Sequence, residues 1–174
     1  MGRLILITGG ARSGKSSFAV ETAKRLGGKV AFVATCEPRD DEMGARVREH
    51  AKKRPPEWST VVEERDVAFV LRELEGDCNV AVVDCITLLV SNLLLAGKSD
   101  EEVIREVRAI ADAAGRAGFT TIVVSNEVGS GVVPENRLGR RFRDVAGTAN
   151  QVVAGRADEV FLTVSGLPLK IKGD

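Results

Sequence analysis

The sequence has no excess of charge and few aromatic side chains. Its 174 residues include 25 Lys and Arg and 25 Asp and Glu, so the formal net charge at pH 7 is zero. Aromatic residues make up 4% of the chain, with one Trp and no Tyr. Binding to DNA or RNA depends on basic surfaces that release counterions, and single strands also stack on aromatic rings. We therefore expect no nucleic-acid partner.

Long apolar runs and paired cysteines are also missing. The longest apolar stretch, from Val80 to Ala96, is interrupted by polar side chains such as Asp84, which argues against a membrane span. The amino-terminus runs directly into a strand-like segment and leaves no room for a signal peptide. Cys36, Cys78 and Cys85 form neither a disulfide framework nor a Cys/His pattern typical of zinc sites. We expect a soluble, cytoplasmic protein.

Short apolar runs alternate with amphipathic segments along the chain. This order is typical of an α/β protein with a mostly parallel sheet flanked by helices, whose ligands bind at the carboxyl ends of the strands. Strands are expected at 4–8, 30–34, 80–84, 121–125 and 159–164, with a closing antiparallel hairpin over 164–172. Helices are expected at 16–26, 40–54, 99–117 and 134–155, the last interrupted near Gly139 and Gly147. A chain of this length supports one domain, over residues 1–174.

A glycine-rich segment lies between the first expected strand and the first expected helix. Its sequence, GGARSGKS, matches the phosphate-binding pattern G-x-x-x-x-G-K-[ST]. Backbone N–H groups and the helix start hold phosphate oxygens in such a loop, Lys15 reaches the outer phosphates, and Ser16 can ligate Mg²⁺. We therefore predict a single P-loop nucleotide-binding domain. The predicted nucleotide contacts in the loop are Gly9, Gly10, Ala11, Arg12, Ser13, Gly14, Lys15 and Ser16.

Asp84 ends the apolar run that begins at Val80. P-loop enzymes hold their metal with an acid at the end of a neighbouring strand, directly or through water, and Asp84 is the candidate for this role. The alternative is that Asp84 caps a helix starting near Ile86. One carboxylate can also serve both purposes.

His50 is the only histidine and is surrounded by cations. Arg46 and Arg54 are four residues before and after it, on the same face of the expected helix. Nearby positive charge keeps an imidazole neutral, and therefore nucleophilic, and attracts a phosphate. A lone histidine beside an apolar helix stripe is more often structural, and a basic cluster is more often a solvated helix end. Spacing alone leaves both interpretations of His50 open.

Several motifs together resemble one enzyme family, over a stretch from about Leu4 to Lys172. They are the P-loop, Ala34-Thr35, Asp41-Glu42-Met43 with Arg46-Val47 and His50, Arg54-Pro55 with Trp58, Asp84-Cys85-Ile86-Thr87, and the stretch from Asn126 to Asp144. In these motifs the sequence is similar to the bifunctional adenosylcobinamide kinase/adenosylcobinamide-phosphate guanylyltransferases of cobalamin biosynthesis.

The resemblance implies two reactions on a RecA-like P-loop fold. A nucleoside triphosphate, ATP or GTP, first phosphorylates the aminopropanol hydroxyl of adenosylcobinamide. GTP then guanylylates a histidine, which falls on His50, and pyrophosphate leaves. Adenosylcobinamide phosphate finally displaces the histidine and gives adenosylcobinamide-GDP. Because neutral imidazole is a good nucleophile, this route divides one difficult displacement between two anions into two easier steps.

The resemblance also implies the site residues and partners. His50 and Lys15 would be catalytic, Ser16 and Asp84 would hold Mg²⁺, and the family forms homotrimers. The implied nucleotide contacts beyond the P-loop are Thr35, Cys36, Glu37, Ala51, Lys52, Lys53, Arg54, Glu63 and Asp84.

Three points stay open at this stage. Glu63 and Glu64 are hard to distinguish, because the alignment shifts by one residue after Trp58. The stretch from Asn126 to Asp144 follows a strand end, so it is a candidate contact for the corrinoid, the phosphates or a neighbouring subunit, or it is a turn and a solvated helix face. The alternative functions are a simple P-loop kinase of another small molecule and a non-enzymatic nucleotide-dependent switch.

Overall fold

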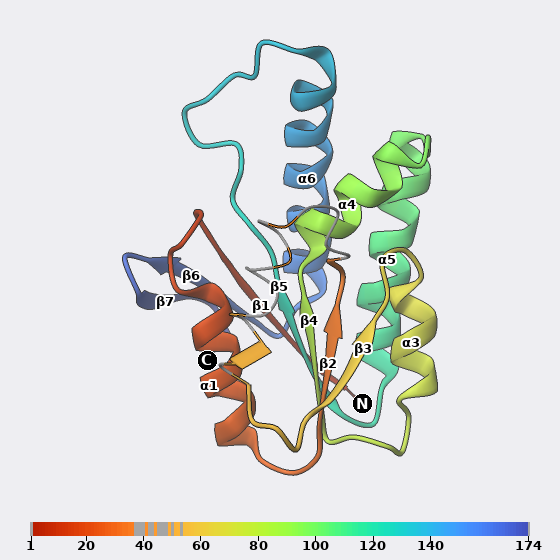
Figure 1. The fold of residues 1–174 in the computed structure, drawn as a ribbon, viewed down its shortest axis with the longest axis vertical. Coiled ribbons are helices and arrows are strands. Elements are labelled where there is room, and N and C mark those ends of the chain that lie inside the picture. The colour runs from red at the N-terminus through yellow and green to blue at the C-terminus, as the bar shows by residue number, and fades with distance from the viewer. Residues whose placement is uncertain are drawn as a thin grey trace.

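The protein is built around one mostly parallel sheet (Figure 1). The structure is a computed structural model and describes residues 2–36, 41, 44, 49, 51–52 and 54–173. Among these residues, seven strands lie in the order β3-β2-β4-β5-β1-β6-β7, and only β6 and β7 pair antiparallel. The strands are β1 (Arg3–Gly9), β2 (Val30–Ala34), β3 (Ser59–Val62), β4 (Val80–Asp84), β5 (Thr120–Val124), β6 (Glu159–Val164) and β7 (Leu167–Lys172).

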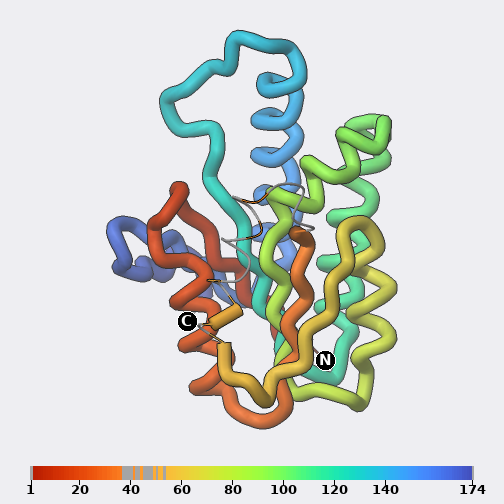
Figure 2. Tube along the Cα trace, viewed as in Figure 1, coloured from red at the N-terminus to blue at the C-terminus, as the bar shows by residue number. Residues whose placement is uncertain are grey.

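Helices cover both faces of this sheet (Figure 2). One face carries α1 (Lys15–Leu26), and the other carries α3 (Val67–Glu73), α4 (Ile86–Leu95), α5 (Asp100–Arg116) and α6 (Arg137–Arg156). Among the described residues, no helix has the length and apolar character needed to cross a membrane.

The two faces are visible in the alternation of residues along β1. Leu4 and Leu6 belong to the cluster of α3 to α6, whereas Ile5 and Ile7 pack with α1, and all four side chains are buried. A strand buried on both sides needs apolar residues at every position, which explains the unbroken run in the sequence.

Most elements expected from the sequence are confirmed. The five strands, the closing hairpin and the helices near 16–26 and 99–117 are present, and a Ser99–Glu102 capping box begins α5. The expected helix over 40–54 lies mostly outside the described residues. Neither β3 nor α3 is expected from the sequence, because β3 is a short, largely exposed edge strand and α3 has only 7 residues.

The predicted interruption of the helix over 134–155 is wrong, because α6 is continuous. Gly139 lies in its first turn, where its N–H donates to the Asn136 side chain at 2.6 Å. A glycine inside a helix costs only about 1 kcal/mol relative to alanine. Burial of apolar residues such as Val145 on the sheet-facing side of α6 offsets that cost, also at Gly147.

The loop after β1 is fixed against the turn between β6 and β7. Ser13 Oγ and Thr163 Oγ1 are hydrogen-bonded at 2.7 Å, and the Gly166 N–H donates to Ser13 O at 3.0 Å. Thr163 Oγ1 also donates to Thr8 O at 3.1 Å. The carboxyl-terminal hairpin therefore supports the glycine-rich loop from the far end of the sequence.

Gly9 is the position at which this support leaves no room for a side chain. A Cβ at Gly9 would lie 2.4 Å from Thr163 O, and the φ angle of +151° is one that side chains rarely adopt. A Cβ at Gly10 would meet nothing within 4 Å.

We therefore expect Gly9→Ala to lower the free energy of unfolding by about 1–3 kcal/mol, as overpacking does. Gly10→Ala is the matched control and should change it by less than about 1 kcal/mol. Urea denaturation of the two variants beside the wild type measures both values. Equal stability of the two variants would contradict the packing described here.

Candidate active site

The carboxyl ends of four strands meet at one edge of the sheet. β2, β4, β5 and β1 are consecutive and parallel, so the segments that follow them are neighbours. Hydrogen bonds continue the pairing past the strands: the Thr35 N–H donates to Asp84 O at 3.1 Å, and the Ser125 N–H donates to Ile7 O at 3.0 Å. The segments from which the sequence predicts a site therefore lie together.

Lys15 begins α1 and is buried within the glycine-rich loop. Its Nζ donates to Gly10 O at 2.5 Å and lies 3.5 Å from Ser13 Oγ. Burial lowers the pKa of the Lys15 ammonium, and the negative charges of Asp84 and Glu127 partly oppose this shift. The ammonium is thus poorly solvated and held by loop oxygens, so an anion entering the loop gains a strong partner.

A cleft of about 280 Å³ lies beside the loop. It brings together Ser16 from the start of α1, Asp84 from the end of β4, and Arg54. All three are predicted site residues that are distant in sequence. The other lining residues are Ser17, Val20, Glu21, Lys24 and Phe32.

Arg54 is held on the wall of this cleft by an aromatic ring. Its guanidinium carbon lies 4.1 Å from the centre of the Phe32 ring, a cation–π contact. Burial lowers the pKa of the Arg54 guanidinium, and the negative charge of Asp84 opposes the shift. The cleft is therefore lined by both a cation and a carboxylate, a combination suited to a bound phosphate and its metal counterion.

Asp84 does not occupy the helix-capping position. Cys85 is the N-cap residue of α4, so the alternative role considered for Asp84 is wrong. The Cys85 thiol is buried, and burial raises its pKa to about 12, so it is not a thiolate nucleophile near neutral pH.

Thr35 is fully buried and joins the ends of β2 and β4. Its hydroxyl donates to Cys85 O at 2.7 Å and accepts from the Cys85 N–H at 2.8 Å. The Asn92 side chain donates to Thr35 O at 2.9 Å. Thr35 therefore positions Asp84, while nucleotide contacts of Thr35 and of the half-buried Cys36 stay predictions.

Glu63 and Glu64 are distinguished by their hydrogen bonds. The Glu63 carboxylate accepts from the N–H groups of Arg65 and Asp66 at 2.8 and 2.9 Å, and these bonds lower its pKa. Glu64 O accepts from the Asn92 side chain at 3.2 Å. Glu63 therefore braces the turn before α3, and its nucleotide contact stays a prediction.

The remaining predicted site residues are only partly described. Ala51 and Lys52 are exposed, and Lys52 forms an ion pair with Glu49 at 2.8 Å. His50, Glu37 and Lys53 lie outside the described residues.

A polar network at the carboxyl ends of β1 and β5 was not predicted as a unit. The Glu127 carboxylate accepts from Thr8 Oγ1 at 2.8 Å and from the Asn150 side chain at 3.0 Å. Asn150 also accepts from Ser125 Oγ at 2.6 Å. Sequence reasoning leaves Glu127 within a stretch of open role, because its neighbours lie more than a hundred residues upstream on β1 and about twenty downstream on α6.

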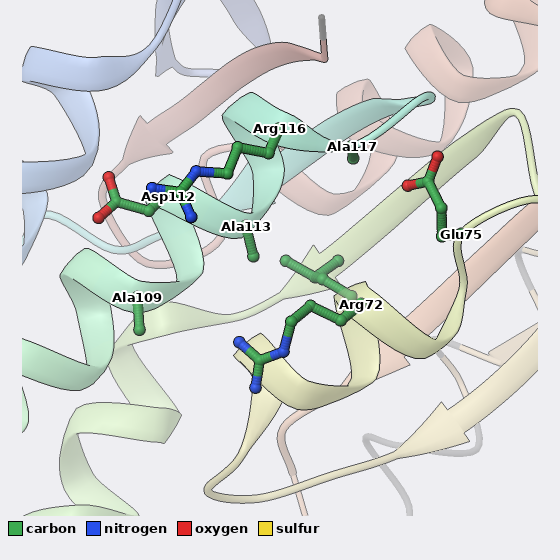
Figure 3. Close-up of a pocket in the computed structure, with 8 residues that line it drawn as sticks. Arg72, Glu75, Ala109, Asp112, Ala113, Arg116 and Ala117 are labelled. Atoms are coloured by element: carbon green, nitrogen blue, oxygen red, sulfur yellow. The ribbon is translucent and has the colours of Figure 1, made fainter.

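A second groove, of about 450 Å³, lies between α3 and α5, on the face of the sheet opposite α1 (Figure 3). Figure 3 shows Arg72 of α3 on the side of Ala109 and Ala113 of α5, and Glu75, which follows α3, near Ala117. This groove contains none of the predicted site residues, and the Glu75 carboxylate accepts a hydrogen bond from the Gly118 N–H at 3.0 Å. The chemistry predicted from the sequence therefore belongs to the smaller cleft.

The fold is shared with a solved structure of low sequence identity. A KaiC-like protein from the hyperthermophilic archaeon Pyrococcus horikoshii OT3 superposes with a TM-score of 0.55, at 18% identity, over 92% of this chain and 70% of that chain. This likeness confirms the predicted fold class, a P-loop fold with a mostly parallel sheet and a closing antiparallel hairpin.

Sequence comparison places the chain more narrowly. The family model described as cobinamide kinase / cobinamide phosphate guanyltransferase matches residues 5–171. The bifunctional adenosylcobalamin biosynthesis protein CobU of Salmonella typhimurium is 42% identical over 97% of this chain and 99% of its own length. The bifunctional adenosylcobalamin biosynthesis protein CobP of Pseudomonas aeruginosa is 41% identical over 97% of this chain and 97% of its own length. CobU of Escherichia coli K12 is 38% identical over 97% of this chain and 99% of its own length. The chain therefore belongs to the cobinamide kinase / cobinamide phosphate guanyltransferase family.

Proposed function

We propose that the protein phosphorylates adenosylcobinamide with ATP or GTP and then transfers GMP from GTP to adenosylcobinamide phosphate. The products of the second reaction are adenosylcobinamide-GDP and pyrophosphate. The observation that carries the proposal is the meeting of Ser16, Arg54 and Asp84 around one cleft beside the P-loop, in a chain that belongs to this family.

The kinase step needs little covalent chemistry from the protein. Phosphoryl transfer depends mainly on positioning the acceptor and neutralising the charge on the phosphates. The N–H groups of Gly9 to Ser16 would bind the phosphates, and Lys15 would exchange its contact with Gly10 O for phosphate oxygens. Arg54 supplies a second cation at the cleft.

Mg²⁺ fits the donors that this cleft offers. The Ser16 hydroxyl and the Asp84 carboxylate are oxygen ligands of the kind Mg²⁺ prefers, and both line the cleft. In the part of the chain that the structure describes, no group of three or more His, Cys, Asp or Glu gathers to hold a metal. This fits a nucleotide-borne Mg²⁺, which takes one or two protein ligands and neutralises phosphate charge when bound.

The second reaction requires a nucleophile that can carry GMP. His50 is the only imidazole in the chain, and it lies between Glu49 and the segment that leads to Arg54. In the proposed route an imidazole nitrogen attacks the α-phosphorus of GTP, an N–P bond forms, and the bond to pyrophosphate breaks. A phosphate oxygen of adenosylcobinamide phosphate then attacks the same phosphorus and releases the imidazole.

We expect His50→Asn to lose guanylyl transfer by about 10³-fold or more while kinase activity persists, because only the second reaction needs the imidazole. Incubation with GTP labelled at the α-phosphate should give the wild type an acid-labile, alkali-stable label. The variant should carry none. Persistent label on His50→Asn, or equal loss of both reactions, would contradict the assignment.

Asp84→Asn tests whether the kinase and guanylyl-transfer reactions use the same Mg²⁺ site. Replacing the carboxylate with an amide removes a charged ligand from both reactions, so we expect both rates to fall on the order of 10²-fold or more. The Mg²⁺ concentration for half-maximal activity should rise. Glu21→Gln, on the same cleft, is the matched control and should leave the Mg²⁺ dependence unchanged. The assignment is wrong if Asp84→Asn and Glu21→Gln have the same Mg²⁺ dependence.

A further inference from the structure

Glu127 is held beside the P-loop by its backbone. It follows β5, the strand between β4, which carries Asp84, and β1, which leads into the loop. The Glu127 N–H donates to Gly9 O at 2.9 Å. The residue is thereby fixed at the start of the phosphate-binding loop, although the two positions are far apart in sequence.

The Glu127 side chain is clamped through one of its two oxygens. Oε1 accepts both from Thr8 Oγ1 at 2.8 Å and from Asn150 Nδ2 at 3.0 Å. Within the described residues, no hydrogen bond reaches Oε2, and the residue is solvent-exposed. The carboxylate is therefore oriented by its neighbours and keeps one oxygen accessible.

The network behind the clamp is itself fixed. Asn150 Oδ1 accepts from Ser125 Oγ at 2.6 Å, which leaves Asn150 Nδ2 as the donor toward Glu127. Thr87 Oγ1 lies 3.2 Å from Ser125 Oγ and accepts from the Asn126 N–H at 2.7 Å. Ser125 and Asn150 are buried, so rearranging the network would leave polar atoms unpaired.

The negative charge of the Glu127 carboxylate beside the phosphate-binding loop suggests a chemical role. The hydrogen bonds to Thr8 and Gly9 place Glu127 where β1 enters the phosphate-binding loop. Its charge also opposes the lowering of the pKa of Lys15, which we expect to bind the outer phosphates. The carboxylate is therefore near the expected position of the transferred phosphoryl group. A carboxylate there repels the nucleotide. Glutamine would accept the same two hydrogen bonds through its amide oxygen without that repulsion. What glutamate adds is a proton acceptor at the accessible oxygen.

We propose that Glu127 is the general base that receives the proton of the acceptor hydroxyl in the kinase step. This inference rests on the proposed function. The hydroxyl oxygen of the corrinoid side chain forms a bond to the γ-phosphorus, and the bond from that phosphorus to the bridging oxygen of the nucleoside diphosphate breaks. The hydroxyl proton passes to Glu127 Oε2 and from there to solvent.

The two reactions differ in their need for this base. An alcohol must lose a proton as it is phosphorylated, whereas adenosylcobinamide phosphate attacks through an oxygen that is already anionic. Removal of the Glu127 charge should therefore slow the first reaction and spare the second.

The test is Glu127→Gln, which keeps the acceptor for Thr8 and Asn150. We expect kcat of the kinase reaction to fall about 10²- to 10⁴-fold with KM for the nucleotide not raised. Guanylyl transfer to preformed adenosylcobinamide phosphate should be unchanged, and so should the melting temperature. Glu127→Asp keeps the carboxylate and should retain more kinase activity than Glu127→Gln. Glu101→Gln removes a charge at an exposed position in the first turn of α5, away from the site, and should behave as wild type.

Kinase turnover of Glu127→Gln close to that of Glu101→Gln would overturn the proposal. Equal loss of both reactions would also overturn it, because it would show a structural role. Wild-type protein that performs neither reaction would instead contradict the proposed function, which is a separate result.

Discussion

The site depends on the parallel register of four strands. Because β2, β4, β5 and β1 are consecutive, their carboxyl ends form one edge, and backbone hydrogen bonds extend the pairing beyond the last strand residues. The bonds from Thr35 to Asp84 O and from Glu127 to Gly9 O fix the functional segments relative to one another. A register shift of one residue in any of these strands would turn the functional side chains toward the opposite face.

This edge gathers charges that the fold itself does not need. Lys15 is buried against loop oxygens, and Arg54 lies over an aromatic ring, with Asp84 acting on the pKa of both. Poorly solvated cations interact strongly with an incoming anion, because less water must be removed when it binds. The apolar clusters on the two faces of the sheet supply the buried core, so the charged side chains at this edge are available for the proposed binding of phosphates.

Much of this arrangement is predictable from the sequence, for identifiable reasons. The glycine-rich segment between a strand and a helix, the apolar run of β1 and the amphipathic helix expected over 99–117 are local patterns, and the structure has each of these elements. The short edge strand β3 and the continuity of α6 depend on tertiary packing, which local propensity does not contain. The bond between Glu127 and Thr8 becomes visible only when β5 is known to lie beside β1.

The central claim is that one cleft beside the P-loop binds the nucleotide for both reactions. An experimental structure with Mg²⁺ and a non-hydrolysable GTP analogue tests this most directly. The account predicts phosphates within hydrogen-bond reach of Lys15 Nζ and the loop N–H groups, with the metal between Ser16 and Asp84. A nucleotide seated in the groove between α3 and α5, or phosphates that leave Lys15 bound to Gly10 O, would contradict it.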